Sequence, residues 1–238
     1  MTKAVGQPLA LDDESPSRTI NETTYRHLRS DLLRCHFAPN ARLRFDELRL
    51  RYGVGVSPLR EAMSRLQSEG LIEIESHKGA RVTGISVTDF LDLAELRITI
   101  EGAALAKAIE RGDDRWEAEL AGAFQYLLRV EERMSEDLAG NDERELRHGR
   151  FHTVLVSACG SRRLLDFRAV LYAQAERYRH LALAYTKGTH PKRDSLEEHR
   201  RLMAAAVARK SKEACALLRD HLQLTTELAL SAVRELEG

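Results

Sequence analysis

The sequence predicts a mainly α-helical protein, in which a small N-terminal domain of three helices and a β-hairpin precedes an all-helical antiparallel bundle. Three observations support this fold class. Apolar residues alternate, as they do in strands, at residues 71–75 and 80–85. From Thr88 onward they recur at helical spacing. Glycine, proline and polar residues interrupt this second pattern, as in bundles with short connections.

The N-terminal domain is expected to contain helices at 19–37, 44–52 and 57–69, strands at 71–75 and 80–85, and a turn at 76–79. Pro39 and Asn40 break the chain after the first helix. Ser57 is placed to cap the third helix, and Pro58 suits its first position because the amide that proline lacks would be unpaired there. Gly70 closes this helix.

The third helix has an apolar inner face and a polar, basic outer face. Its inner residues are Leu59, Met63 and Leu66, and its outer residues are Arg60, Ser64 and Gln67. A short helix of this kind, held by a preceding helix and turn, is suited to the major groove of DNA. Three helices and a hairpin form a winged helix-turn-helix. The alternative is a small helical subdomain whose arginines only solvate its surface.

Basic residues are concentrated in the segment that is expected to read DNA. Residues 18–85 hold 12 lysines and arginines against 8 acidic residues, a net charge of +4, although the whole chain is neutral. Residues 1–17 and 86–238 each carry a net charge of −2. Binding to phosphates requires such a local excess. Because the excess is modest, we expect a homodimer that binds DNA with two copies of the domain.

Length and composition limit the class of protein. The 238 residues allow a tail at 1–17, a DNA-binding domain at 18–85 and a helical domain at 86–238. Three scattered cysteines argue against a disulfide framework and fit a reducing compartment. No apolar run approaches the roughly 20 residues that span a bilayer, and the N-terminus lacks a secretory pattern. We therefore expect a cytoplasmic protein without a membrane partner.

The helical domain is expected to contain helices at about 88–111, 114–138, 142–158, 161–186, 194–209 and 211–235. Thr88 is placed to cap the first of these helices. The inner side of that helix carries Phe90, Leu93, Leu96, Ile100 and Leu105. Trp116, the single tryptophan, is expected to pack in the core.

Four histidines of the helical domain are candidate metal ligands. His148 and His152 lie four residues apart and project from one helix face, while His199 and His221 lie on the last two helices. Apolar neighbours place all but His148 on inward faces. Neutral imidazoles of this kind accept Zn²⁺, Ni²⁺, Cu²⁺ or Fe²⁺. The alternative is a set of core histidines, because a chain with nine histidines contains some paired spacing by chance.

The runs YGVGVSPLREAMSRLQSEGLI at 52–72 and KGARV at 78–82 resemble the DNA-binding half of GntR-family transcription regulators. The rest of the chain is similar to the FCD ligand-binding domain of the FadR-type branch, so the resemblance runs from about residue 18 to the C-terminus. The segment LRHGRFHTVLVSACGS at 146–161 is most similar to the carbon-starvation-induced repressors, which govern glutarate and 4-aminobutyrate catabolism genes.

This resemblance implies a metal site. The FadR-type branch often holds a metal with an aspartate and a histidine four residues apart, plus one histidine from each of two later helices. His152, His199 and His221 match these histidines, whereas His148 stands at the aspartate position. Zinc or nickel is the expected ion. Because four neutral ligands leave its 2+ charge intact, we expect a dianionic effector, such as glutarate, whose carboxylate completes the metal shell.

Arg97 and Tyr178 are the candidate effector-binding residues. Arg97 lies beside an apolar face, and an inward arginine holds a carboxylate through two parallel hydrogen bonds. The alternative for Arg97 is an ion pair with Glu101 or with an acid of another helix. Tyr172, Arg177 and Tyr178 are candidates for the lining of the same pocket, and the sequence does not choose among them.

The expected function is that of a dimeric repressor that reads a pseudo-palindromic operator, with one third helix in each major groove. Arg60 is the candidate for a direct contact with a base, and we expect that base to be guanine. The other candidate DNA contacts are Arg44, Ser57, Pro58 and Arg65 near the groove, and Lys78, Gly79 and Arg81 on the hairpin. Val56 stands where many relatives carry an arginine, so their operators cannot be transferred to this chain.

Two other functions remain open at the level of sequence. A helical metalloenzyme would use the four histidines, but it leaves residues 18–85 without a role and lacks an obvious general base beside the metal motif. A DNA-binding regulator with a purely structural metal would respond to no effector.

Overall fold

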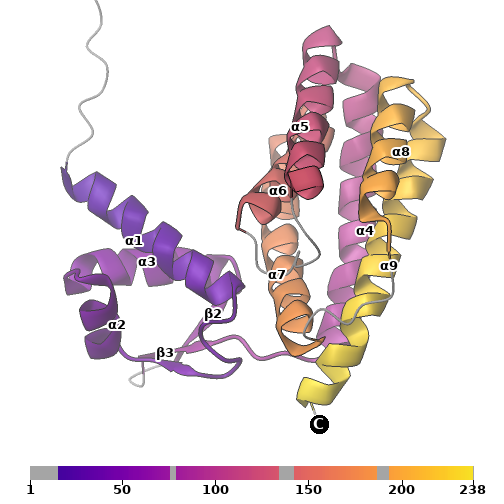
Figure 1. Cartoon of the computed structure of the whole chain (residues 1–238). Coiled ribbons are helices and arrows are strands. Elements are labelled where there is room, and N and C mark those ends of the chain that lie inside the picture. Colours follow the sequence, from indigo (N-terminus) through magenta and orange to yellow (C-terminus); the bar gives the residue numbers. More distant parts are fainter. Residues whose placement is uncertain (1–15, 76–78, 134–141, 187–192, 238) are drawn as a thin grey trace, which may run out of the picture.

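The mainly helical fold predicted from the sequence is confirmed. The computed structural model describes residues 16–75, 79–133, 142–186 and 193–237. Figure 1 shows a small N-terminal domain beside the lower part of a bundle of long helices. Among the helices of these ranges, none combines the length and apolar character that a membrane span requires.

The small domain contains the expected helices and hairpin, and a short strand that was not expected. Its elements are α1 (Pro16–Leu33), β1 (Arg42–Leu43), α2 (Phe45–Tyr52), α3 (Val56–Ser68), β2 (Ile72–Glu75) and β3 (Gly79–Val82). The strands form an antiparallel sheet in the order β1-β3-β2. Ile72 pairs with Val82 and Ile74 with Ala80 in the hairpin. Residues 76–78 of the turn expected at 76–79 lie outside the described residues, and Gly79 begins β3.

An apolar core holds the small domain together. The side chains predicted to line the inner face of α3 are buried in it, with the following partners from other elements: Leu28, Leu32, Leu43, Leu48, Ile72 and Val82. Ala173 belongs to the same core although it lies in the bundle helix α7 (Arg162–Thr186). The two domains therefore share apolar contacts.

Several helix ends differ from the prediction, and three of the differences within the described residues concern caps or more than three residues. Helix α3 begins at Val56 with Gly55 as its N-cap, so Ser57 lies inside the helix and makes no cap bond. Ser86, rather than Thr88, caps the next helix by accepting a bond from the amide of Asp89. Helix α1 ends at Leu33, four residues before the predicted end.

Gly70 ends the third helix as predicted. Its φ of +69° lies in the left-handed region, and the amide of Leu71 donates to the carbonyl of Leu66. Such a glycine reverses the chain directly after a helix. Strand β2 therefore starts close to the end of α3.

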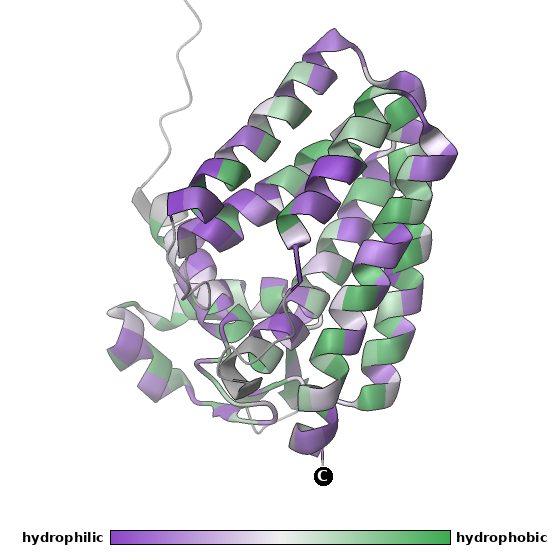
Figure 2. Ribbon diagram, turned by 45° about the vertical axis from the view of Figure 1, so that its right-hand side comes forward, coloured by the Kyte–Doolittle hydropathy of each residue, from purple (hydrophilic) through white to green (hydrophobic). Residues whose placement is uncertain are grey.

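The helical domain is an antiparallel bundle of the remaining helices. They are α4 (Val87–Arg111), α5 (Asp114–Arg133), α6 (Asp142–Ser157), α7, α8 (Ser195–Val207) and α9 (Ser211–Glu237). Within these bounds the expected order and lengths hold. Figure 2 shows apolar and polar positions alternating along the bundle helices, as expected when one side of each helix faces a core.

The bundle core confirms most of the predicted inner residues. Phe90, Leu93 and Leu105 are buried, and Trp116 is buried with its ring nitrogen donating to the carbonyl of Val154. Leu96 is an exception, because 46% of it is exposed. The inner stripe of α4 is thus narrower than the periodicity indicated.

Replacing Leu105 with alanine should destabilise the bundle. The side chain is fully buried, so Leu105→Ala is expected to lower the free energy of unfolding by about 2–5 kcal/mol. The control Leu96→Ala removes the same atoms from an exposed position of the same helix, and about 0.5 kcal/mol or less is expected. Urea unfolding followed by circular dichroism and Trp116 fluorescence measures both. Equal losses in the two variants would contradict the assigned core.

Candidate functional site

The outer face of α3 is open to solvent, as its sequence pattern predicted. Ser57, Arg60, Ser64 and Gln67 are exposed, while Pro58 is half-buried. No hydrogen bond or ion pair links the Arg60 guanidinium to another described residue. This side chain is therefore available for an external contact.

Arg65 does not lie as expected. Its guanidinium stacks on the ring of Tyr25, 3.4 Å from the centroid, and Nη1 lies 2.8 Å from Oε2 of Glu22. Both partners belong to α1, so Arg65 ties α3 to α1. Sequence spacing on α3 alone carries no signal for these contacts with another helix.

The hairpin and β1 bring other candidate DNA contacts to one sheet. Arg42 of β1 pairs in register with Arg81 of β3, whose Nη1 donates to the carbonyl of Asn40 at 2.7 Å. Gly79 begins β3 with a φ of +91°. Arg44 is exposed, and its Nη1 lies 3.7 Å from Oε1 of Glu47. Lys78 lies outside the described residues.

The four candidate histidines converge inside the bundle from three helices. His148 and His152 come from α6, His199 from α8 and His221 from α9. Their ring centroids lie 4.6–6.5 Å apart, and one nitrogen from each lies within 4.8 Å of the others. His148 is half-buried and the other three are buried. We call this set the histidine cluster.

The imidazole side chains of the histidine cluster are neutral. Burial disfavours the protonated imidazole and neighbouring positive charges add to this effect, so the pKa values of His148, His152 and His199 lie well below the ordinary value. Burial also lowers the pKa of His221. Metal ligation requires neutral imidazoles.

Glu198 orients one ring of the cluster. Nδ1 of His221 lies 2.8 Å from Oε2 of Glu198, which also accepts a bond from Arg193. Burial alone would raise the pKa of the Glu198 carboxyl, but its bonds with Arg193 and His221 outweigh burial and lower the pKa to about 2. The ionised carboxylate holds the proton on Nδ1, so Nε2 of His221 is left with a free lone pair.

The donor atoms of the cluster fit a transition metal. Nε2 of His152 lies 3.1 Å from Nε2 of His199, and the Nδ1 atoms of His148, His152 and His199 are buried without a hydrogen-bond partner in the described part of the chain. Buried polar atoms are normally paired. Four convergent, neutral nitrogen donors are a suitable ligand set for zinc or nickel.

Arg97 is ion-paired within its own helix. Its Nε donates to Oε1 of Glu101 at 2.7 Å, and Nε of Arg168 lies 3.5 Å from the other carboxylate oxygen. Burial alone would raise the pKa of Glu101, but the two arginines outweigh burial and hold the pKa below its ordinary value. One carboxylate thus faces two guanidinium groups, whose Cζ atoms lie 5.1 Å (Arg97) and 4.8 Å (Arg168) from the ring centroid of Tyr172.

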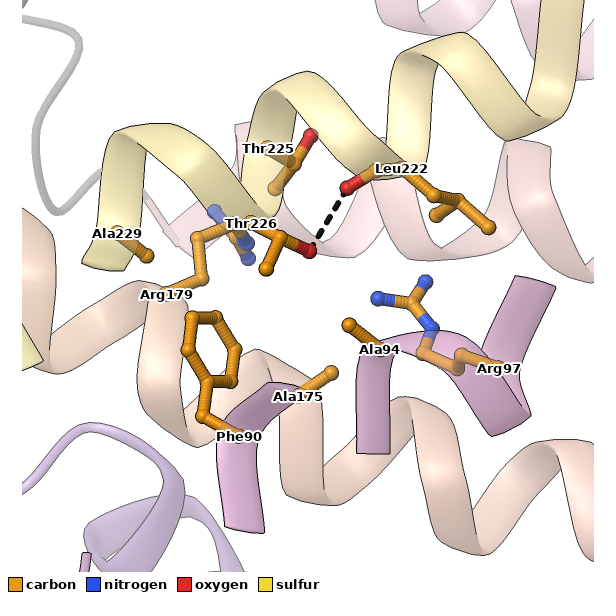
Figure 3. A pocket seen from close by; sticks show the side chains of 9 residues that line it. All are labelled: Phe90, Ala94, Arg97, Ala175, Arg179, Leu222, Thr225, Thr226 and Ala229. Carbon is orange, nitrogen blue, oxygen red and sulfur yellow. Dashed lines mark hydrogen bonds between the residues drawn. The ribbon is translucent and has the colours of Figure 1, made fainter. Parts of the chain in front are cut away.

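A small cavity of about 20 Å³ lies beside Arg97. Its lining comes from α4, α7 and α9 and consists of Phe90, Ala94, Arg97, Ala175, Arg179, Leu222, Thr225, Thr226 and Ala229. Figure 3 shows the Arg97 guanidinium pointing toward the side chains of α9. Arg179 lines the cavity and is also paired with Glu145. Burial lowers the pKa of His221, and Arg97, which lines the cavity, is near enough to the histidine cluster that its charge adds to this effect.

Tyr178 lies elsewhere than expected. Its hydroxyl donates to Oδ2 of Asp89 at 2.7 Å, its ring stacks on Phe90, and it does not line the cavity. Sequence reasoning missed the buried Arg168 and the cavity-lining Arg179. Both are spaced to share a face of α7 with Tyr172 and Ala175, a signal that a search for inward arginines would have found.

Comparison with protein families gives two matches that together span most of the chain. The model of the bacterial regulatory proteins of the gntR family matches residues 20–82, and the model of the FCD domain matches residues 92–224. The first match covers α1 to β3 and the second covers most of the bundle.

Individual relatives are transcription regulators. The sequence is 39% identical over 200 residues to the HTH-type transcriptional repressor GlaR of Escherichia coli (strain K12), covering 83% of this chain and 90% of that relative. It is 34% identical over 219 residues to the HTH-type transcriptional regulator BphR of Paraburkholderia xenovorans (strain LB400), covering 92% and 86%.

Solved structures share the fold at lower identity. Escherichia coli McbR/YncC superposes with a TM-score of 0.72 at 19% identity, covering 88% of this chain and 96% of that one. A GntR transcriptional regulator from Rhodococcus sp. RHA1 superposes with a TM-score of 0.68 at 20% identity, covering 90% and 98%. The arrangement of a small domain and a bundle therefore recurs in these proteins.

Removing the Glu101 carboxylate should destabilise the bundle strongly. Glu101→Ala leaves the buried Arg168 and the partly buried Arg97 without their counter-ion, and a loss of about 3–5 kcal/mol in the free energy of unfolding is expected. The control Glu95→Ala changes an exposed carboxylate of the same helix, for which about 0.5 kcal/mol or less is expected. Urea unfolding measures both. A small effect at Glu101 would show that the carboxylate does not balance the arginines.

Proposed function

The chain belongs to the GntR family of bacterial regulatory proteins, and we propose that it is a DNA-binding repressor whose bundle holds a metal ion and responds to a small carboxylate. The division into a tail at 1–17, a DNA-binding domain at 18–85 and a metal- and effector-binding domain at 86–238 is part of this proposal. The metalloenzyme alternative is set aside, because the relatives and structural neighbours are transcription regulators.

The exposed face of α3 supports DNA reading. Its N-terminal residues project from a short helix that the small domain holds firmly, which is the geometry by which such helices reach base edges. Arg60 is exposed and unpaired among the described residues, so it is the assigned base contact. Ser57 and Pro58 lie beside it, while Arg44, Gly79, Lys78 and Arg81 are assigned to the DNA backbone. Arg65 is not retained, because α1 engages it.

A homodimer is part of the proposal because one α3 covers only one half-site. Two subunits related by a two-fold axis read a pseudo-palindrome, with their reading helices about one turn of DNA apart. Repression is proposed from the relatives, since GlaR and RspR of Escherichia coli (strain K12) are both transcriptional repressors.

The histidine cluster is the proposed metal site. His148, His152, His199 and His221 would hold zinc or nickel, and Glu198 keeps the ring of His221 in the ligating tautomer. When bound, such an ion supplies a positive charge that attracts a carboxylate oxygen. The convergence of one nitrogen from each of the four histidines to within 4.8 Å is the observation that carries this assignment.

The arginines beside the cluster support an anionic effector. The guanidinium groups of Arg97 and Arg168 share the single carboxylate of Glu101, which leaves one positive charge unbalanced, and Arg97 lines the cavity. A dicarboxylate such as glutarate would place one carboxylate at the metal and the other at Arg97. The cavity of about 20 Å³ holds no more than a water molecule, so side chains around it must separate to admit such a ligand.

A regulator with a purely structural metal is the second candidate. The histidine cluster is buried and joins α6, α8 and α9, so an ion there would stabilise the bundle without any effector. Stabilisation by zinc alone, with no response to any dicarboxylate, would favour this candidate.

Arg60→Ala should weaken operator binding without affecting the bundle. The loss of one bidentate contact to a base is expected to reduce the binding free energy by about 1–3 kcal/mol. Fluorescence anisotropy with a duplex selected by the wild-type protein from a random library measures this change. The control Arg115→Ala alters an exposed arginine of α5 and should bind like the wild type. Unchanged binding by the Arg60 variant would refute its assignment.

Glu198→Ala should weaken metal binding through His221. Removing a carboxylate that orients a ligating imidazole is expected to lower zinc affinity by about 10–100-fold. Calorimetric titration of zinc into chelator-treated protein measures the affinity and the expected ratio of one ion per chain. The control Glu197→Ala removes the neighbouring carboxylate, which pairs with Arg200 at the surface, and should bind zinc normally. Equal affinities in both variants would contradict the oriented-ligand assignment.

The same preparations test the effector. Glutarate titrated into zinc-loaded wild-type protein is expected to bind more tightly than in the chelator-treated protein, because the ion adds an attractive charge. Equal affinities would remove the metal from effector binding. If glutarate binds neither the zinc-loaded nor the chelator-treated protein, glutarate is not the effector.

A further inference from the structure

Helix α7 lies between the small domain and the cavity. One face of the helix contacts the small domain, and another face lines the cavity. Ala173, Gln174 and Arg177 contact the small domain or the segment that follows it. Ala175 and Arg179 line the cavity on the other side. Residues three or four apart share a helix face, so the two sets form two separate stripes.

Gln174 bonds the beginning of the hairpin. Its Nε2 donates to the carbonyl of Glu69 at 2.9 Å, directly before the left-handed Gly70. A Cβ atom at Gly70 would overlap the Gln174 side chain, so the approach is close. The carboxylate of Glu69 is held in turn by Arg29 and Tyr25 of α1. Glu69 therefore connects Gln174 of α7 to helix α1 of the small domain.

Arg177 bonds the other end of the hairpin. Its Nη2 donates to the carbonyl of Gly84 at 2.5 Å, between β3 and α4. Only 4% of Arg177 is exposed, and its Nε and Nη1 have no hydrogen-bond partner in the described part of the chain. Thr83 joins the two ends of the hairpin, because its amide donates to Leu71 and its hydroxyl to Gly70.

The segment between the domains is also tied to the cavity wall. Tyr178 follows Arg177 and stacks on Phe90 with centroids 4.4 Å apart, and Phe90 lines the cavity. The Tyr178 hydroxyl accepts from the amide of Ser86 at 3.3 Å and donates to Asp89. A shift of Phe90 would thus move Tyr178, which is the neighbour of Arg177 on α7.

We propose that Gln174 and Arg177 are positioning residues that hold the DNA-reading domain in one orientation on the bundle, by bonding the backbone at both ends of its hairpin. Because α7 also forms a wall of the cavity, a ligand that enlarges the cavity shifts these two bonds and turns the domain. This second step rests on the proposed effector function. The holding role does not, because it requires only the contacts described above.

Hydrogen–deuterium exchange of the full chain, without DNA or ligand, tests the holding role. Gln174→Glu keeps the shape of the side chain but removes the donor, and Arg177→Met removes the buried guanidinium. Each is expected to speed exchange at 69–71 and 83–87 by about tenfold, with α5 unchanged. X-ray scattering should show a larger maximum dimension, because the reading domain is released.

Two further variants separate positioning from general stability. Arg177→Lys keeps a donor for the Gly84 carbonyl and is expected to restore much of the protection. Arg163→Met changes an exposed arginine of the same helix and should behave like the wild type. Wild-type exchange in both Gln174→Glu and Arg177→Met would overturn the proposal. Faster exchange throughout α5 would also overturn it, because the residues would then only stabilise the bundle.

A cavity-filling variant tests the link across α7. Ala175→Val adds bulk to the cavity wall and is expected to change exchange at 69–71 and 83–87 while Trp116 fluorescence keeps its folded signal. If Ala175→Val does not fold, Ala229→Val fills the same cavity from α9. Unchanged exchange at both segments would refute the link. Operator binding and glutarate binding are measured in separate experiments. If the protein fails to bind the operator or glutarate, the proposed function is wrong, but the exchange result still tests the contacts of α7.

Discussion

Helix α7 is the constraint on which both functional regions depend, because one rigid element completes the core of the small domain and forms a wall of the bundle cavity. Ala173 is fully buried among residues of the small domain, and Ala175, two positions later, lines the cavity. A packed helix moves as a unit, since interiors have few voids to absorb displacement. In our proposal a rearrangement on one side of α7 therefore shifts the contacts on its other side. The contacts at Glu69 and Gly84 are made to backbone carbonyls, so they act on the path of the chain rather than on a side chain.

Charge sets the chemistry of the bundle interior. The histidine cluster is held neutral by burial, whereas Glu101 stays ionised because two arginines face it. The region beside the cavity therefore carries positive charge before any ion binds. Burying such charge is costly unless it is paired, so an incoming carboxylate finds partners that the protein itself leaves only partly satisfied. In our proposal the neutral imidazoles would bind the metal and the arginines next to them would bind the anion.

Periodicity was a good guide to the elements and a poor guide to their ends. Helical spacing is a local property, so the bundle helices and the two faces of α3 were predicted correctly from neighbouring residues alone. The caps were wrong because the position of a cap depends on where the backbone turns into the helix, which a suitable side chain does not decide. Ser57 and Thr88 both suit the role, but the backbone turns into the helix at Gly55 and Ser86 instead. Strand β1 was missed because two residues are too few to show alternation.

The sequence by itself determined the fold class, the outward direction of Arg60 and the inward direction of His152, His199 and His221. Each of these follows from residues within one or two turns of a helix. Only the tertiary structure decided which side chains meet across helices. His199 and His221 meet the two histidines of α6, and Glu198 accepts a hydrogen bond from His221. Arg65 contacts Tyr25 of α1, and Tyr178 donates a hydrogen bond to Asp89. Spacing along a helix identifies neighbours on that helix alone, whereas these partners are distant in sequence and meet only through the packing of the whole chain.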